Sequence, residues 1–598
     1  MSESTLDLTE PRASAEDALS GITVEVVLYA ALAFLAFFIR FFLLGNLPLD
    51  SNEARQALAS WNFFHGIPDS FTGSPLLFVG NAVLFALVGA TDTAARLFPA
   101  LAGTALVLLP ALLRQSLGRT GALLASLLFV FSPTLVLFSR QVDGVIIAMT
   151  CALAAVTFAW RHLAENKPQD AYLAAVLAAL ALLAASEVWT IVLATLVFLL
   201  WVRLSRQPFP APAFDARRVA LLFVLVLVGA STAFLLHRGG LGAAFDLFGA
   251  WLDSLRPGGS LFDPLRLLVL YEPIALFFGA VAAIDIAFGA RESIWLQTPR
   301  VALALWAVIA FVLYSISADK SPAHVVAILV PLTLIACGFI GAWFDDLAEA
   351  IRSAPQAKQM LLTQEGPVLF LTTSLAGFIY LVLAGFAQNG GLGAADLLVT
   401  NFGIAPGSVG GLNLAIIFLL FVGAFLAVAF LGITTLGFGR ARNLAVVFIL
   451  GLFGLWTCRQ SVMLNFTLAP NVVEWLAPSA AAPNLRDLVS DVEDASRWRA
   501  NDTHTIAISV DDSLGAGVAW ALRDFSSARF ASHPAAAPGV QALVLPGDAP
   551  GPEGWIGQRY DLEFSRGNSP VPSLLRWLIF RDVGSVQSKD AVLWLPAP

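Results

Sequence analysis

The chain has few charged residues for its length. Only 13% of its 598 residues are Asp, Glu, Lys or Arg, whereas 58% are hydrophobic, and the mean hydropathy is +0.79. Soluble domains carry about 25% charged residues, so this scarcity excludes an ordinary soluble protein. The net charge of −8 and the lack of basic runs exclude nucleic acid as a partner. The composition therefore predicts a polytopic membrane protein.

Cysteine and histidine are also scarce. The three cysteines (Cys151, Cys337 and Cys458) lie in apolar stretches without metal-ligand spacing, and the six histidines are scattered. Disulfide frameworks and zinc sites need repeated residues at short spacings. We therefore expect no disulfide and no dedicated metal site.

Long apolar runs dominate the first three quarters of the chain. A transmembrane helix needs roughly 17–25 apolar residues. About thirteen spans are predicted, near residues 22–44, 94–113, 120–138, 144–160, 171–185, 189–204, 218–236, 267–288, 301–317, 324–343, 367–388, 411–434 and 443–463. Residues 76–90 form an apolar run below that length, which predicts an interfacial helix instead of a span.

The distribution of Arg and Lys predicts the topology. Residues 1–21 are polar and form an expected cytoplasmic tail before an uncleaved signal anchor, and residues 45–93 form a long first outer loop. The loops then assigned to the inside hold most of the basic residues. We expect a multi-pass plasma-membrane protein with a cytoplasmic N-terminus and an extracytoplasmic C-terminus.

The composition changes after about residue 468. Residues 22–468 form the predicted transmembrane domain, and residues 469–483, rich in Ala and Pro, form a predicted linker. Within residues 484–598, helical patterns near 485–498, 514–525 and 573–581 alternate with strand-like runs near 505–510, 540–545 and 591–595. The fold class is therefore a polytopic all-α membrane protein with a small C-terminal extracytoplasmic α/β domain.

Ionisable residues cluster on the predicted outer side. The set comprises Asp50, Glu53, Arg55 and Arg96 around the first loop, Arg140 and Asp143 after the third span, Glu187 after the fifth, and Lys320 and His324 between the ninth and tenth. A carboxylate can accept a proton from an attacking hydroxyl, and a cation can stabilise a departing phosphate. The pattern suits group transfer from a lipid phosphate, although charges at span ends are also common as membrane anchors.

Several motifs resemble those of the dolichyl-phosphate-mannose protein mannosyltransferase superfamily, the multi-spanning GT-C glycosyltransferases. Asn52-Glu-Ala-Arg55 resembles the family's acidic first-loop motif, Gly73-Ser-Pro-Leu-Leu77 its following Pro-Leu stretch, and Thr93-Ala-Ala-Arg-Leu-Phe-Pro-Ala-Leu-Ala-Gly103 its "AARL…PAL" stretch. Ser132-Pro133 through Ser139-Arg-Gln-Val-Asp143 is similar to a further motif. Tyr271-Glu-Pro273, Asp319-Lys-Ser-Pro322 and Ala519-Trp-Ala-Leu-Arg-Asp524 resemble the subgroup of archaeal flippase-associated membrane proteins.

The resemblance implies an enzyme that transfers a sugar from a polyprenyl-phosphate donor to a hydroxyl acceptor on a protein, lipid or glycan. The chain departs from the family at Asn52, where the catalytic aspartate usually stands, and at Ser186, where the subgroup often has lysine. An amide is no general base at neutral pH. The role of base is therefore assigned to Glu53, with Asp50 in reserve.

The other roles follow from charge. Arg140 and Lys320 would hold the phosphate, Asp143 and Glu187 would position sugar or cations, and Arg55 would orient the carboxylates, with Arg96 and His324 as further substrate-binding residues. No cofactor is required, although Asp50, Glu53 and Asp143 could hold a divalent cation. Two alternatives stay open: a non-catalytic lipid-linked-sugar carrier or flippase accessory, favoured by Asn52, and a receptor or scaffold that works through its C-terminal domain.

Overall fold

The computed structural model describes residues 23–67, 73–204, 215–237, 239–288, 294–353, 357–388, 409–467, 474–566, 574–582 and 585–597. The predicted cytoplasmic tail, residues 1–21, and residues 469–473 of the predicted linker lie outside these ranges.

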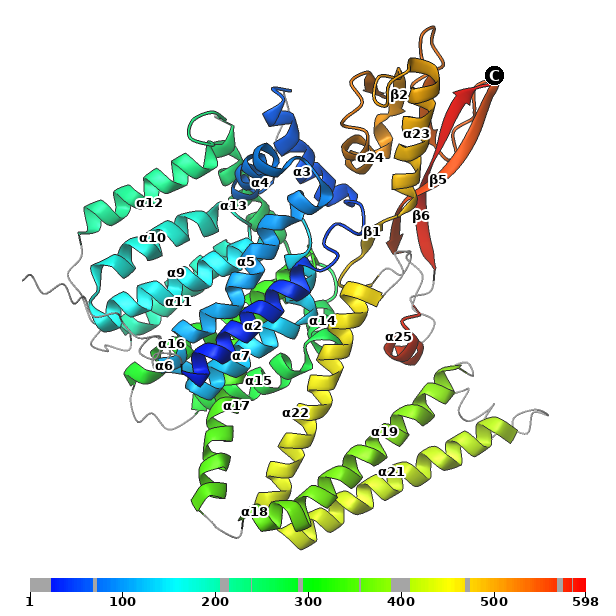
Figure 1. Ribbon diagram of the computed structural model, residues 1–598. Helices are drawn as coiled ribbons and strands as arrows, with labels where there is room; N and C mark the ends of the chain where they lie inside the picture. Colours follow the sequence, from blue (N-terminus) through cyan, green and yellow to red (C-terminus); the bar gives the residue numbers. More distant parts are fainter. Residues whose placement is uncertain are drawn as a thin grey trace, which may run out of the picture.

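Long apolar helices form most of the molecule (Figure 1). Within the described ranges, eight helices are long and apolar enough to cross a membrane, or ten if each of two bent pairs is one span. The eight lie within α2 (Val24–Phe41), α5 (Asp92–Leu112), α9 (Val145–Glu165), α16 (Ile294–Ile316), α17 (Ala323–Ser353), α19 (Gly366–Gln388) with the preceding turn Leu361–Glu365, α21 (Val409–Leu436), and α22 (Phe438–Val462) with the following turn Met463–Thr467.

Two predicted spans are broken, each directly before a proline. Helices α7 (Arg119–Phe131) and α8 (Pro133–Ser139) meet at 59°, and α14 (Asp263–Tyr271) and α15 (Pro273–Phe288) meet at 115°. Proline has no N–H to continue the preceding helix but fits the first turn of a new one. The sequence prediction treated each pair as a straight span, and the structure corrects that.

Three further predicted spans correspond to shorter helices. These are α10 (Pro168–Leu182), α11 (Val188–Leu204) and α12 (Ala216–Ser231), of 15, 17 and 16 residues. Such lengths lie at or below the lower limit of about 17 residues for a span. The total of thirteen spans therefore remains a prediction, whereas the polytopic helical architecture is confirmed.

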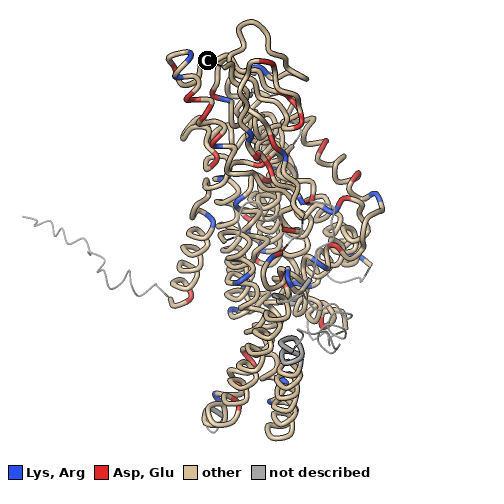
Figure 2. Tube along the Cα trace, turned by 90° about the vertical axis from the view of Figure 1, so that its right-hand side faces the viewer, with Lys and Arg blue, Asp and Glu red and all other residues tan. Residues whose placement is uncertain are grey.

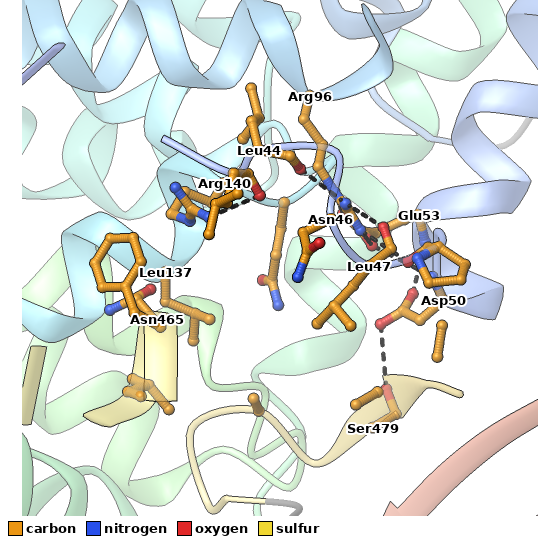
Figure 3. Close-up of a pocket in the computed structure, with 18 of the residues that line it drawn as sticks. Leu44, Asn46, Leu47, Asp50, Glu53, Arg96, Leu137, Arg140, Asn465 and Ser479 are labelled. Carbon is orange, nitrogen blue, oxygen red and sulfur yellow. Dashed lines mark hydrogen bonds and ion pairs between the residues drawn. The ribbon is translucent and has the colours of Figure 1, made fainter. Parts of the chain in front are cut away.

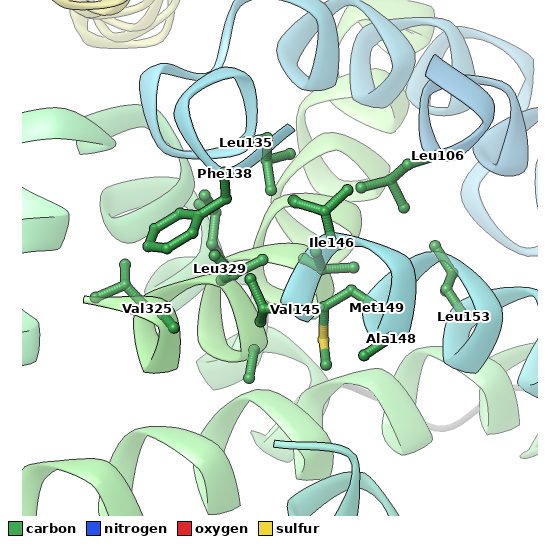
Figure 4. Packing of buried hydrophobic residues seen from close by; sticks show 14 of the residues in the cluster. Leu106, Leu135, Phe138, Val145, Ile146, Ala148, Met149, Leu153, Val325 and Leu329 are labelled. Atoms are coloured by element: carbon green, nitrogen blue, oxygen red, sulfur yellow. The ribbon is translucent and has the colours of Figure 1, made fainter. Parts of the chain in front are cut away.

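Helix α17 lies at the centre of the packed body. Of its most apolar 18-residue window, 89% is buried, against 11% for α2 at the periphery. Figure 4 shows Val325 and Leu329 of α17 packed with Phe138, Val145 and other apolar residues of α5, α8 and α9. Helix α6 (Arg114–Leu117) packs against α17, and α13 (Gly240–Ser254) contacts α4 and α12. Helix α18 (Ala357–Met360) lies outside the packed body, directly before the segment that leads into α19.

The first loop folds into two helices beside the packed body. Helix α3 (Ser51–Phe64) is followed by α4 (Pro75–Val88), and α4 packs against α3 and α5. With 14 residues, α4 is too short to cross a membrane, as the sequence predicted. Its place at a membrane interface remains a prediction.

The C-terminal part is a six-stranded mixed sheet with strand order β1-β5-β6-β4-β2-β3. Among the described strands, the pairs β2–β3 and β2–β4 are parallel, and the pairs β1–β5, β4–β6 and β5–β6 are antiparallel. The elements are β1 (Ser479–Ala481), α23 (Asn484–Ala500), β2 (Ile508–Asp511), the 3₁₀ turn Asp512–Leu514, α24 (Ala516–Ala521), β3 (Ala528–Ala531), β4 (Ala542–Pro546), β5 (Trp555–Arg566), α25 (Leu574–Phe580) and β6 (Val586–Pro596). The predicted small α/β domain is confirmed as a fold class.

The boundaries of this domain differ from the expectation. Strand β1 lies in the stretch predicted as a linker and pairs with β5. Helix α25 lies away from the sheet and contacts α19 (Figure 1). Figure 2 shows charged residues concentrated in this domain and at the adjoining helix ends, whereas the helices farther away are mostly uncharged.

Candidate active site

The site is built around the start of helix α3. Asp50 is the N-cap residue, and its Oδ1 accepts hydrogen bonds from the backbone N–H groups of Asn52 and Glu53, each at 2.9 Å. The Glu53 side chain returns to the Asp50 backbone N–H at 3.3 Å. This reciprocal capping box follows from the local Asp-x-x-Glu spacing. Local sequence alone thus places both carboxylates at one helix end.

Arg96 of α5 binds Glu53 with two parallel contacts. Its Nε donates to Oε1 at 2.8 Å, and its Nη2 donates to Oε2 at 2.5 Å (Figure 3). The backbone N–H of Val142 also donates to Oε1, at 2.9 Å. Glu53 is 7% exposed. With both oxygens already bound to strong donors, Glu53 is poorly suited to take a proton from a substrate.

The remaining donors of Arg96 hold the loop before α3. Its Nη1 donates to the carbonyls of Leu44 and Leu47, and its Nη2 donates to that of Pro48. All three nitrogens of this guanidinium are therefore occupied. Arg96 fixes the backbone that presents Asp50 and has no nitrogen free of a protein acceptor.

Asp50 has the less restricted carboxylate. Its Oδ2 accepts a long hydrogen bond from the Ser479 hydroxyl of β1, at 3.4 Å. Burial, with smaller contributions from the nearby Glu53 and Glu563 carboxylates, raises the pKa of Asp50 to about 7. A base whose pKa lies near the working pH is the most effective. Of the two carboxylates, Asp50 therefore has the side-chain oxygen that protein donors occupy less fully.

Two cavities meet at Asp50. One, of about 420 Å³, is acidic, and its described lining includes Asp143, Glu187, Asp319 and His324 but no Lys or Arg. The other, of about 240 Å³, includes Arg140 and Arg96 together with leucines and a phenylalanine. The residues that line both are Asp50, Glu53, Gln141, Ala477 and Ser479.

The acidic cavity gathers carboxylates from four loops. Asp143 Oδ1 accepts a hydrogen bond from the Val145 N–H at the start of α9, at 2.7 Å. Burial, together with the neighbouring Glu187, raises the pKa of Asp143 to about 6. His324 Nε2 lies 3.8 Å from Glu187 Oε1 and 3.7 Å from Asp319 Oδ2. Burial raises the pKa of Glu187 as well. The tertiary fold thus joins residues that the sequence spreads over nearly three hundred positions.

Arg140 lines the smaller cavity but is also bound to the protein. Its Nη1 donates to the carbonyls of Ile39, Arg40 and Phe42, and its Nη2 donates to that of Leu43. These carbonyls lie at the end of α2 and just after it, where a basic side chain is an ordinary partner. A phosphate would have to share this guanidinium with the helix end.

The structure brings two predicted residues to neither cavity. Arg55 is exposed on α3, and residues two apart on a helix face different directions, so Arg96 and not Arg55 contacts Glu53. Lys320 donates to the carbonyls of Tyr314 and Ser315, at 3.1 and 2.8 Å, and so caps the end of α16. The roles that we assigned to Arg55 and Lys320 are corrected accordingly.

Other lining residues were not anticipated. The Gln56 side-chain amide donates to the Ser74 carbonyl and accepts from the Ser74 backbone N–H, each at 3.3 Å. Ser479 comes from the predicted linker. Ser74 lies within the Gly73-Ser-Pro-Leu-Leu77 motif, whereas Gln56 and Ser479 carry no sequence signal for a site. Among the described residues, no group of three or more His, Cys, Asp or Glu has the geometry of a metal site.

Comparisons with known proteins agree with this architecture. Residues 73–231 match the family model of dolichyl-phosphate-mannose-protein mannosyltransferase. ArnT from Cupriavidus metallidurans bound to undecaprenyl phosphate has a TM-score of 0.51 at 16% identity, over 96% of this chain and 99% of that one. The Archaeoglobus fulgidus oligosaccharyltransferase tethered to an acceptor peptide has a TM-score of 0.45 at 11% identity, over 87% of this chain and 69% of that one.

No curated protein sequence matches the chain. The family match covers α4 to α12, which include Arg96, Arg140, Asp143 and Glu187, and the likeness to ArnT extends over the whole fold. Residues 73–231 thus match the mannosyltransferase family model, and the likeness to ArnT shows a shared membrane-protein fold.

Proposed function

We propose that the protein transfers a sugar from a polyprenyl-phosphate donor to a hydroxyl acceptor on the extracytoplasmic side of the membrane, with Asp50 as the general base. One observation carries the proposal: Asp50 lies at the junction of an arginine-lined cavity and an acidic cavity. A base at such a junction can reach an acceptor in one cavity while the donor occupies the other.

The smaller cavity suits the donor. Arg140 supplies positive charge, and Leu43, Leu137 and Phe466 supply an apolar wall. A lipid phosphate combines these two properties, an anionic group and an apolar chain. ArnT, which shares the fold, was solved with undecaprenyl phosphate bound.

The reaction then needs one proton transfer and one displacement. Asp50 accepts the proton of the acceptor hydroxyl as its oxygen attacks the anomeric carbon. The bond from that carbon to the phosphate oxygen breaks, and the polyprenyl phosphate leaves with the bonding electrons. Arg140 stabilises the charge that develops on the phosphate. A divalent cation held by Asp50, Glu53 and Asp143 would compete with Arg96 for Glu53, so the mechanism relies on none.

The test is turnover of purified protein with a panel of polyprenyl-phosphate sugars. Asp50→Asn is the key variant, because Asn caps a helix as well as Asp does while it cannot accept the proton. Arg55→Gln, on the exposed face of the same helix, is the matched control. We expect Asp50→Asn to lower turnover by at least about a hundredfold, the lower range for removal of a general base, and to retain donor binding. Arg55→Gln should keep the turnover of the wild type.

Two results would contradict this assignment. Equal turnover in the wild type and Asp50→Asn would remove Asp50 from the chemistry. Donor binding without turnover in every variant would favour the lipid-linked-sugar carrier, for which Asn52 at the family's usual aspartate position is the supporting observation.

A further inference from the structure

Helices α19 and α21 form a hairpin that stands apart from the packed body. Only 11% and 6% of their most apolar windows are buried. Figure 1 shows the hairpin next to α18, α22 and α25. At the end near α25, Phe386 and Val382 of α19 pack with Leu575. The opposite end, near the turn at Gly437, lies far from the C-terminal sheet (Figure 1).

A cavity of about 290 Å³ lies between the hairpin and α22 at this far end. It is lined by Val368, Thr372, Phe425, Ala429, Gly432, Ile433, Phe438, Ala441, Arg442, Leu444, Ala445 and Phe448. Thr372 donates its hydroxyl to backbone carbonyls of its own helix. Apart from Arg442, the described lining is therefore effectively apolar.

The length of the cavity corresponds to one leaflet. On α22 the lining runs from Phe438 to Phe448, and ten residues at 1.5 Å per residue span about 15 Å. The hydrocarbon core of a bilayer is about 30 Å thick. Arg442 lies one turn after the start of α22 at Phe438, at the end of the cavity that is farthest from the C-terminal sheet.

The charge at this end is not balanced within the cavity. Arg440 Nε lies 3.9 Å from Glu365 Oε1, so that arginine has an acidic neighbour. Arg442 lines the cavity, and no carboxylate is among the described lining residues. The guanidinium of Arg442 suits the anionic headgroup of a lipid. The apolar lining, about one leaflet long, suits its acyl chain.

We propose that an anionic phospholipid binds between α19, α21 and α22, with its headgroup on Arg442 and an acyl chain along the cavity. The lipid comes from the leaflet opposite the C-terminal sheet. It fills the gap between the hairpin and α22 and so fastens the hairpin to the body. This site is separate from the proposed active site and does not depend on that function.

The test uses the full chain in nanodiscs and lipid retention measured by native mass spectrometry, with phosphatidylglycerol compared with phosphatidylcholine. We expect phosphatidylglycerol to be retained preferentially. Arg442→Gln should weaken that retention about fivefold, as for the loss of one lipid-facing cation, and should abolish the preference over phosphatidylcholine. Ala445→Phe, which fills the groove, should reduce the retention of both lipids.

Arg440→Gln is the matched control, because it removes the same charge two residues away without changing the cavity lining. Equal losses in Arg440→Gln and Arg442→Gln would show only general surface attraction and overturn the proposal. Unchanged retention in Ala445→Phe, with circular dichroism showing a folded protein, would also overturn it.

Discussion

Glu272 and Ser132 join the two broken spans of the membrane domain. The Ser132 hydroxyl donates to Glu272 Oε1 at 2.6 Å, and the backbone N–H of Thr134 donates to the same oxygen at 3.1 Å. Each residue directly precedes the proline at its break. One buried carboxylate thus links the two breaks through a side-chain and a backbone donor.

Removal of this carboxylate should destabilise the membrane domain. Glu272→Ala leaves two buried donors unpaired, each at a cost of about 1–3 kcal/mol. We expect a lower thermal unfolding midpoint in detergent. Glu272→Gln keeps an acceptor oxygen at the same place and should recover most of the loss. Equal midpoints for Glu272→Ala and the wild type would show that the link between the breaks does not contribute to stability.

We expect the Glu53–Arg96 ion pair to contribute mainly to the stability of the fold and not to the chemical step. Glu53→Ala leaves a buried guanidinium without its carboxylate, which typically costs about 3–5 kcal/mol. The thermal unfolding midpoint should fall sharply, whereas Arg55→Ala on the exposed face should change stability by no more than about 0.5 kcal/mol. A stable Glu53→Ala protein that had lost only turnover would instead return the role of base to Glu53.

The raised pKa of Asp50 predicts a pH-dependent rate. The base is active as the carboxylate, so turnover should rise with pH through an apparent pKa of about 7. A rate profile across neutral pH, measured at saturating donor, checks this. A rising limb near the ordinary carboxyl value of about 3.9 would mean that Asp50 is not the titrating group.

The raised pKa of Asp50 also predicts that the ionised side chain lowers the free energy of unfolding. Because the pKa of Asp50 is raised from its ordinary value of 3.8 to about 7 in the folded protein, the folded protein binds more protons than the unfolded chain between these two pH values. Stability therefore falls as pH rises through this window and stays lower above it. Asp50→Asn should be more stable than the wild type above pH 7, and the difference should shrink on acidification. The measurement is the unfolding midpoint of both proteins against pH.

We expect the Ser479 hydroxyl to lower the pKa of Asp50. Its hydroxyl donates to the charged form of Asp50, and loss of such a donor raises a carboxyl pKa. In Ser479→Ala the rising limb of the rate profile should move to higher pH, and Ser479→Thr should restore it. If Ser479→Ala changes the rate but leaves the apparent pKa of the pH–rate profile unchanged, Ser479 contributes only packing.

Much of the fold follows from local sequence. Apolar runs long enough to span a membrane became helices at nearly every predicted place, because a buried backbone in lipid must satisfy its own hydrogen bonds. Strands β2, β4 and β6 overlap the predicted runs, since the overlapping stretches are largely apolar and mostly buried. Strands β1, β3 and β5 were missed, because β1 and β3 are only three and four residues long and β5 carries several charged residues.

The breaks were less predictable. The prolines at positions 133 and 273 mark where a helix cannot continue, but they do not set angles of 59° and 115°. Those angles depend on what the next helix packs against. A carboxylate at Glu272 that reaches Ser132 is a contact across 140 positions, and hydropathy carries no information about it.

The sequence by itself determined the membrane-protein class, the carboxylates at the start of α3 and the ionisable residues around them, because apolar length and helix capping are local properties. Only the tertiary structure decided which cation meets which group. Arg96 forms an ion pair with Glu53, whereas Arg140 and Lys320 donate to carbonyls at helix ends. Asp50 lies at the junction of two cavities. The physical reason is that a buried charge takes the partner that packing brings within hydrogen-bond distance, not the nearest one along the chain.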